Sequence, residues 1–176
     1  MPKTALIITD MLNSYDHEDG DTLAECVREK LPAIVQLCER AREDDDTLVV
    51  YANDNHDRWE AGREDLVRQA LDGKYPDLVE PIAPHAAVPF IAKGRHSIFY
   101  ETAADHLLRV SDVRRIVLAG QVTEQCILYS ALDAYLRGYE VWAPRDAIAH
   151  IHPDFAEAAI GMMERNMHAD VSPACP

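Results

Sequence analysis

The sequence lacks several features that mark particular classes of protein. No apolar run approaches the roughly 20 residues needed to cross a bilayer; strong runs such as 6–8 and 48–50 are much shorter. A signal peptide is not expected, because Asp10 interrupts the first apolar stretch. Internal repeats, linkers and low-complexity tracts are also missing. We therefore expect one globular, cytoplasmic domain over residues 1–176.

The sequence contains few cysteines, and its basic residues are fewer than its acidic ones. The four cysteines show no CxxC spacing, so we interpret them as reduced thiols. Lys and Arg number 17 against 31 Asp and Glu, which gives a net charge of −14. Such an acidic chain is poorly suited to bind nucleic acid or anionic membranes. A dinucleotide site has no support, because no Gly-rich loop follows the first predicted strand. The expected partner is a small-molecule substrate.

Apolar runs alternate with amphipathic segments along the chain. The runs predict strands over 4–9, 47–51, 88–92, 115–119 and 139–143, and an edge strand over 169–172. Helical periodicity predicts a short helix near 22–29 and a main helix that begins at Pro32. Further helices are expected over 63–71, 102–110, 124–136 and after residue 153, with loops over 52–62 and 72–87. This alternation predicts a doubly wound α/β domain, with helices on both faces of a mostly parallel sheet.

Two of these helices have a predicted inward face. The 3.6-residue period assigns it to Leu128, Ala131, Leu132 and Tyr135 in one helix, and to Phe155, Ala159, Met162 and Met163 in the last.

Three reactive side chains follow predicted strands directly. Asp10 and Lys93 come after the first and third strands, and Cys126 lies in the first turn of the helix that follows strand 115–119. Ligands of such folds bind at the carboxyl ends of strands, so we expect the three to lie together. Thr123 could cap that helix, and the free N–H groups would make the Cys126 thiol lose its proton more easily.

This trio would suit acyl transfer. Asp10 could accept the thiol proton, and Lys93 would favour both the thiolate and the carboxylate. Backbone N–H groups of the turn before the helix could bind an oxyanion. The alternatives are an inert buried Cys126, a capping Asp10 and an ordinary surface Lys93.

At these positions the sequence resembles the isochorismatase-like cysteine hydrolases, a family that includes nicotinamidases, N-carbamoylsarcosine amidases, and biuret and ureidoacrylate hydrolases. The resemblance runs from about residue 4 to 172. Three segments carry it: Leu6-Ile-Ile-Thr-Asp10 followed by Tyr15, Lys93 with Ser97-Ile-Phe99, and Gly120-Gln-Val-Thr123-Glu-Gln-Cys126.

The resemblance implies a three-layer fold with a six-stranded sheet and a catalytic triad of Asp10, Lys93 and Cys126. It also implies a cis peptide bond before Val122 and an oxyanion hole made by the backbone N–H groups of Val122 and Cys126. The implied reaction is thiolate attack on a carbonyl, loss of ammonia or an amine, and hydrolysis of a thioester. A homo-oligomer, dimer or tetramer, is expected from the same resemblance.

Substrate-binding residues are less clearly marked. Tyr15 stands where the family usually has Phe, and it could stack on a flat substrate. Trp59, Tyr100 and Gln121 are further candidates, although Trp59 and Tyr100 could equally belong to the core or an interface. His96 lies beside the Lys93 segment and could line the pocket. Leu12 departs from the family, which often has Gln there.

We predict neither a metal nor another cofactor. Asp54-Asn-His56 resembles part of the metal motif of nicotinamidases, but His85 lies beyond the usual interval for the next ligand. A catalytic metal site of this kind needs at least three protein ligands. The asparagines that flank Asp54 and the nearby Trp59 favour a metal-free branch.

The leading hypothesis is therefore a cysteine hydrolase that cleaves a C–N bond, other than a peptide bond, in a small amide, carbamoyl or ureido compound. Hydrolysis of an isochorismate-like vinyl ether is the second reading, although it should not need a nucleophilic cysteine. A non-catalytic or redox-sensing protein on the same fold is the third.

Overall fold

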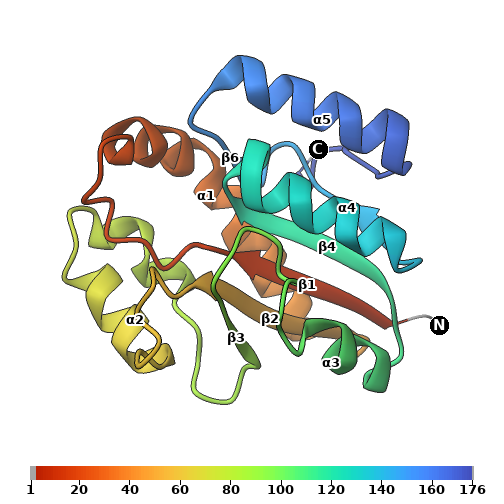
Figure 1. Ribbon diagram of the computed structural model, residues 1–176, viewed down its shortest axis with the longest axis horizontal. Helices are drawn as coiled ribbons and strands as arrows, with labels where there is room; N and C mark the ends of the chain where they lie inside the picture. The colour runs from red at the N-terminus through yellow and green to blue at the C-terminus, as the bar shows by residue number, and fades with distance from the viewer. Residues whose placement is uncertain (1–2, 176) are drawn as a thin grey trace.

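The computed structural model describes residues 3–175. A six-stranded parallel sheet forms its centre (Figure 1). The strands are β1 (Lys3–Thr9), β2 (Thr47–Asp54), β3 (Phe90–Lys93), β4 (Val113–Gln121), β5 (Glu140–Trp142) and β6 (Ile148–Ala149). Their order is β3-β2-β1-β4-β5, and β6 pairs with the last residues of β4. The predicted α/β class with a mostly parallel six-stranded sheet is confirmed.

Helices cover the sheet on both faces (Figure 1). On one face lie α1 (Gly20–Glu43) and α2 (Arg63–Leu71), together with the 3₁₀ turns η1 (Pro76–Leu78) and η2 (Glu80–Ile82). On the other lie α3 (Ala104–Val110), α4 (Leu128–Leu136) and α5 (Pro153–Met167). The π-helical turn η3 (Thr123–Ile127) joins β4 to α4. Among the described residues, no helix is both long and apolar enough to span a membrane.

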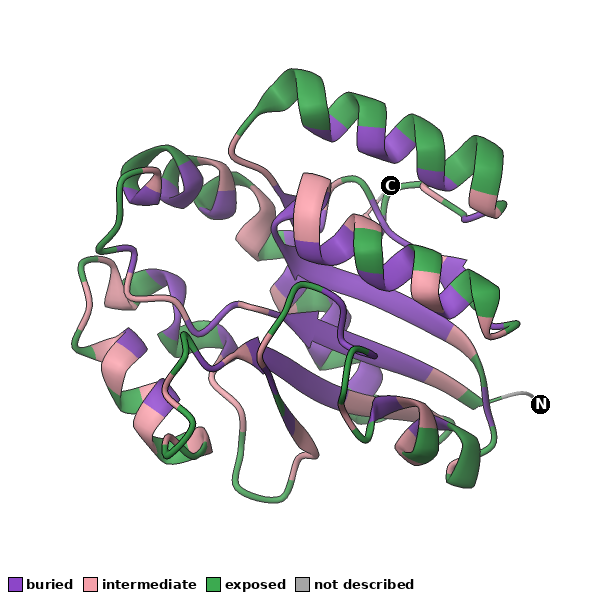
Figure 2. Ribbon diagram, viewed as in Figure 1, coloured by how far each residue is buried: buried purple, intermediate pink, exposed green. Residues whose placement is uncertain are grey.

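The central strands β1 and β4 are buried on both faces over most of their length, as Figure 2 shows in purple. Successive residues of β1 alternate between two cores: Leu6 and Ile8 pack toward α1, whereas Ala5 and Ile7 pack toward α4. This explains the nearly continuous apolar run, because a central parallel strand has no face in water. Full burial of one such Leu or Ile side chain contributes about 1.5–3 kcal/mol.

Helix α1 differs from the prediction, because it runs unbroken through Pro32. The predicted break rested on the missing N–H of proline and the crowding of the carbonyl four residues earlier. Both Pro32 and Arg28 lie on the exposed side of α1, where water can bond the freed carbonyl. The buried stripe continues on either side of this point, with Val27 before it and Ile34 after it. Packing of that stripe therefore outweighs the local cost of the proline.

The predicted inward faces of α4 and α5 are partly wrong. Leu132 and Tyr135 are exposed in α4, whereas Ser130, Ala131 and Ala134 of α4 and Ile127 of η3 are buried. The π-helical turn η3 contains one more residue per turn than an α-helix. The buried face of α4 is therefore shifted by one residue relative to the predicted face. In α5, Phe155 and Met162 are exposed, while Ala156, Ala159, Ile160 and Met163 are buried.

The sixth strand also differs from the expected edge strand over 169–172. Those residues contribute an isolated bridge between Asp170 and Trp142, whereas β6 completes the sheet. A two-residue strand is too short to give a periodic signal. The expected loop over 72–87 is more ordered than predicted, because η1 and η2 bury Leu78, Val79 and Ile82 in the core.

Candidate active site

Neighbouring strands deliver polar side chains to one edge of the sheet. Asp10 follows β1, Asp54 ends β2 and Lys93 ends β3, while Cys126 lies in η3 directly after β4. Because these four strands are adjacent and parallel, their carboxyl ends meet in one place. The sequence placed the end of β2 at residue 51, so it missed Asp54 as a neighbour of Lys93.

Lys93 lies between an acid and a thiol. Its Nζ atom is 2.8 Å from Oδ2 of Asp10 and donates a hydrogen bond to the Cys126 sulfur over 3.6 Å. The Lys93 side chain is fully buried, and that of Asp10 is 13% exposed. The structure thus brings together the three residues that the sequence predicted to lie at one site.

Backbone and side-chain bonds fix Asp10. Its Oδ1 accepts a 2.6 Å hydrogen bond from the Asp54 N–H, which leaves Oδ2 directed at Lys93. The amide of Gln121 donates to the Asp10 carbonyl over 2.6 Å. Asp10 has φ 52°, a left-handed conformation that is uncommon for a residue with a side chain. These contacts hold the carboxylate in a single direction.

Gly120 allows β1 and β4 to stay close up to the site. Its φ is 119°, and a Cβ atom there would lie 2.2 Å from the carbonyl oxygen of Thr9. Any side chain would force apart the two strands immediately before Asp10. The first glycine of the Gly120–Cys126 motif therefore has a steric role.

The charge on Lys93 is stabilised in spite of its burial. Burial alone would lower the pKa of Lys93, but Asp10, Cys126 and Asp54 together raise it above its ordinary value. Oδ2 of Asp54 lies 3.8 Å from the ammonium, and the carbonyl of Arg95 accepts a 3.2 Å bond from it. Lys93 is therefore a fixed cation.

The expected depression of the thiol pKa is wrong. Burial raises the pKa of Cys126, and the Asp10 carboxylate raises it further. Lys93 and the Val122 N–H lower this pKa, but their combined effect is smaller. The predicted cap is also absent, since the Thr123 hydroxyl donates to the Ala149 carbonyl at 2.9 Å instead. The raised pKa favours the thiol form of Cys126, so nucleophilic attack by this sulfur would need a base to accept its proton.

The turn before Cys126 matches the expectation drawn from the family. The peptide bond between Gln121 and Val122 is cis. The Val122 carbonyl accepts bonds from the N–H groups of Gln125 and Ile127, on either side of Cys126. The Val122 N–H faces the Cys126 sulfur and lowers its pKa. A small carbonyl compound at this sulfur would therefore meet backbone donors.

The four predicted substrate-binding residues lie in different surroundings. Tyr15 is 1% exposed, with its ring edge against Tyr75 at 6.0 Å. Gln121 is equally buried beside Asp10. Trp59 is 74% exposed, yet its ring lies over Gly94, next to Lys93. Tyr100 is exposed on the loop after β3.

The residues around Asp54 do not fit a metal centre. In the described part of the chain, no three His, Cys, Asp or Glu side chains are grouped so that they could hold an ion. Oδ1 of Asp54 already accepts the His56 N–H at 2.7 Å, and Oδ2 faces the Lys93 ammonium. A cation would compete with Lys93 for the same carboxylate.

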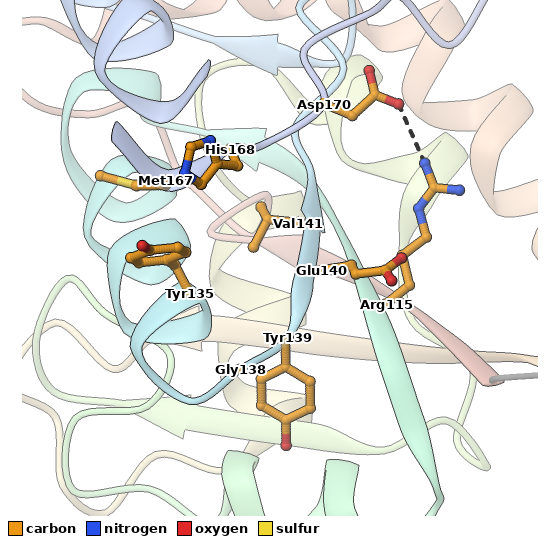
Figure 3. A pocket seen from close by; sticks show the side chains of 9 residues that line it. All are labelled: Arg115, Tyr135, Gly138, Tyr139, Glu140, Val141, Met167, His168 and Asp170. Carbon is orange, nitrogen blue, oxygen red and sulfur yellow. Dashed lines mark hydrogen bonds and ion pairs between the residues drawn. The ribbon is translucent and has the colours of Figure 1, made fainter. Parts of the chain in front are cut away.

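A separate groove of about 590 Å³ lies along β5, away from this site (Figure 3). Figure 3 shows the ion pair between Arg115 and Asp170, 3.3 Å long, at one end of it. Tyr135 and His168 line the other side. Neither Cys126 nor Lys93 is among its lining residues, so the groove is not part of the candidate site.

A thiol beside a buried cation and a carboxylate, at the carboxyl edge of a parallel sheet, combines the groups that nucleophilic catalysis requires. Comparison with known proteins defines the family. Residues 4–174 match the model of the isochorismatase domain, and the chain belongs to the isochorismatase family.

Two relatives and one solved structure illustrate the membership. The uncharacterized isochorismatase family protein YaaI of Bacillus subtilis is 35% identical over 168 residues, which cover 96% of this chain and 92% of that protein. Maleamate amidohydrolase of Pseudomonas putida is 28% identical, over 89% of this chain and 76% of the relative. The crystal structure of the nicotinamidase from Staphylococcus aureus superposes with a TM-score of 0.75 at 26% identity, over 98% of both chains.

Proposed function

We propose that the chain is a metal-free cysteine hydrolase that cleaves the C–N bond of a small amide, carbamoyl or ureido compound. The observation that carries the proposal is the buried contact of the Cys126 sulfur with Lys93, which is itself paired with Asp10. The names of the amidohydrolase relatives support the same class of bond. A vinyl ether hydrolase would have no use for this thiol.

The reaction begins when the thiol proton of Cys126 passes to the Asp10 carboxylate as the sulfur attacks the substrate carbonyl. A new C–S bond forms, and the carbonyl oxygen becomes an oxyanion. In this proposal, the backbone N–H groups of Val122 and Cys126 bind that oxyanion. The proton then moves to the leaving nitrogen as the C–N bond breaks, and ammonia or an amine departs. Water hydrolyses the thioester and returns the proton to the sulfur.

The raised pKa of Cys126 fits this order of events. A free thiolate next to Asp10 would place two negative charges at one buried site. Proton transfer during attack avoids that state, because the charge moves on to the carbonyl oxygen. Lys93 offsets the negative charge at each stage, since it contacts both partners.

A panel of small amides and ureido acids, assayed for ammonia release, tests the proposal. The wild-type chain should release ammonia from at least one of them, and Cys126→Ala should reduce that rate by about 10⁴-fold or more. Cys175→Ala serves as a matched control, because this thiol contacts Gln36 and lies outside the site. Retained turnover in Cys126→Ala would overturn the covalent mechanism.

A further inference from the structure

Strands β1 and β4 stop pairing immediately before Asp10. The last paired residues are Thr9 and Gly120. Asp10 then turns away with φ 52°, while its N–H donates to the Ala52 carbonyl of β2 at 2.9 Å. Toward β4 a side chain continues the connection, because the Gln121 amide donates to the Asp10 carbonyl at 2.6 Å. Gln121 thus ties the turn that carries Asp10 to the strand that precedes the candidate nucleophile.

The Gln121 side chain is buried, with 1% of the residue exposed. A buried amide costs free energy unless it is hydrogen-bonded, whereas methionine would fill a similar volume without that cost. Burial raises the pKa of Tyr15, and contact with the Gln121 side chain lowers it by less, so the phenol faces the same amide. The bond to Asp10 is therefore the interaction that a polar residue supplies at this position.

The backbone of Gln121 serves the other side of the site. Its peptide bond with Val122 carries the Val122 N–H, which faces the Cys126 sulfur. The Asp10 carboxylate contacts the same sulfur. One residue therefore holds Asp10 with its side chain and presents a donor to the sulfur with its main chain.

The other groups around the Asp10 carboxylate come from different strands. The Asp54 N–H at the end of β2 donates to Oδ1 at 2.6 Å, and Lys93 at the end of β3 pairs with Oδ2 at 2.8 Å. His96, on the loop after β3, places Nδ1 at 3.6 Å from the Cys126 sulfur. None of these residues belongs to β4. The amide bond from β4 is therefore the contact that fixes the carboxylate relative to the sulfur.

We propose that Gln121 is a positioning residue, which aligns the Asp10 carboxylate with the Cys126 sulfur so that the thiol proton can pass between them. The proposal rests on the proposed function only for turnover, because the proton transfer can be measured without a substrate. Gln121 itself exchanges no proton and forms no bond to the substrate. Without its amide, the Asp10 carbonyl loses its partner on β4, and the carboxylate loses its fixed direction toward the sulfur.

Alkylation of Cys126 with iodoacetamide measures this transfer. The S–H bond breaks, the C–S bond forms, iodide leaves and Asp10 takes the proton. The rate is followed by mass spectrometry of the peptide that contains Cys126, across the pH range, in wild type and Gln121→Met. Thr123→Val is the matched control, because it removes another buried bond directly after β4, from the Thr123 hydroxyl to the Ala149 carbonyl at 2.9 Å.

Near neutral pH, Gln121→Met should react about tenfold more slowly than wild type, because its carboxylate is misaligned with the sulfur. The deficit should shrink at alkaline pH, where the thiol ionises without a base, and Thr123→Val should keep the wild-type profile. Wild-type rates in Gln121→Met would overturn the proposal. An equal deficit in Thr123→Val, or a deficit in Gln121→Met that is the same at every pH, would also overturn it and leave Gln121 with a packing role.

A second variant, Gln121→Glu, separates the hydrogen bond from the shape of the side chain. A protonated carboxyl can donate to the Asp10 carbonyl, and burial favours that form at about pH 6. This variant should match wild type at that pH and fall behind as its carboxyl ionises at higher pH. It also decides the question if Gln121→Met does not fold. A slow rate in acid, or a constant ratio to wild type across the pH range, would contradict the proposal.

Turnover of a substrate from the amide panel gives an independent measurement. In Gln121→Met, kcat should fall about tenfold with KM unchanged, because the amide aligns a base and does not bind the substrate. A rise in KM alone would assign Gln121 to substrate binding and overturn the positioning role. If alkylation behaves as expected but no amide is turned over, the alignment of Asp10 by Gln121 stands and the proposed hydrolase function fails.

Discussion

Nζ of Lys93 is 2.8 Å from Oδ2 of Asp10 in a site where the lysine side chain has no exposure to water. Two opposite charges buried so closely depend on one another, because removal of either leaves the other unpaired. The pair also joins the carboxyl end of β1 to that of β3, across β2. Its chemical role and its structural role can therefore be tested together.

Lys93→Met should lower the free energy of unfolding by about 3–5 kcal/mol, because it leaves a buried carboxylate without a partner. The double variant Asp10→Asn, Lys93→Met should lose less than the sum of the single losses. Urea denaturation gives the four values of this cycle. Lys74→Met, which removes an exposed ion pair with Asp21, is the control and should change little. Additive losses would show that the pair is not coupled.

The wild-type chain should lose stability at alkaline pH, and Tyr15→Phe should lose less. Burial raises the pKa of Tyr15 from 10.0 to about 12. The pKa of Tyr15 is higher in the folded chain than in the unfolded chain. The stability that comes from burying the neutral phenol is therefore fully present below pH 10, and it is lost as the pH rises toward 12. The wild-type chain should lose about 2 kcal/mol more than Tyr15→Phe over this range. Unfolding free energies from pH 8 to 11.5 measure it, and parallel curves would contradict the assignment.

Trp59→Ala should weaken substrate binding without destabilising the fold. The ring is 74% exposed and lies over Gly94, so it can form a wall beside Lys93 with little role in the core. We expect KM to rise about fivefold to tenfold, with a change in unfolding free energy below about 0.5 kcal/mol. Steady-state kinetics on any substrate from the amide panel measure the first value. Tyr100→Ala in the same assay tests the other predicted wall. An unchanged KM would remove Trp59 from the site.

Chelation should leave the activity intact. The donors near Asp54 are shared with the Lys93 ammonium and the His56 N–H, and residues 3–175 offer no group of three donors for an ion. Wild-type ammonia release should be equal before and after dialysis against EDTA, and His56→Ala should keep most of it. Loss of activity that added zinc or iron restores would refute the metal-free proposal.

The chain should also assemble with copies of itself. Leu132 and Leu136 of α4 and Phe155 and Met162 of α5 are large apolar side chains exposed on neighbouring helices. Such surface is commonly covered by a second subunit. Sedimentation velocity should show a dimer or tetramer, and Leu136→Lys should shift it toward the monomer. A wild-type monomer at micromolar concentration would contradict this expectation.

Much of the site could be predicted because the ends of the buried strands can be recognised in the sequence. A nearly continuous apolar run stops at Asp10, at Lys93 and shortly before Cys126, and parallel pairing then brings the three ends to one edge. Neighbouring groups were harder to foresee. Asp54 was missed because β2 runs three residues past the apolar run, and the contact of His96 with the sulfur depends on bonds from its loop to α4.

The errors share a physical origin, since each local rule was overridden by packing. Pro32 did not break α1, because the buried stripe of the helix continues on both sides of it. The buried face of α4 differs from the predicted one because the π-helical turn η3 precedes the helix, and no residue pattern predicts such a turn. The thiol pKa followed burial and the Asp10 carboxylate rather than the helix end, because a helix end acts more weakly than a charged group in contact.

The wide separation of the site residues along the chain has a consequence for folding. Asp10, Lys93 and Cys126 meet only after β1 has paired with β2 and β4, and β2 with β3. Such non-local pairing forms late and slowly. The alkylation rate of Cys126 therefore reports when the sheet is complete. During refolding, the appearance of the native alkylation rate of Cys126 should mark the moment at which the last of the strands β1, β2, β3 and β4 docks.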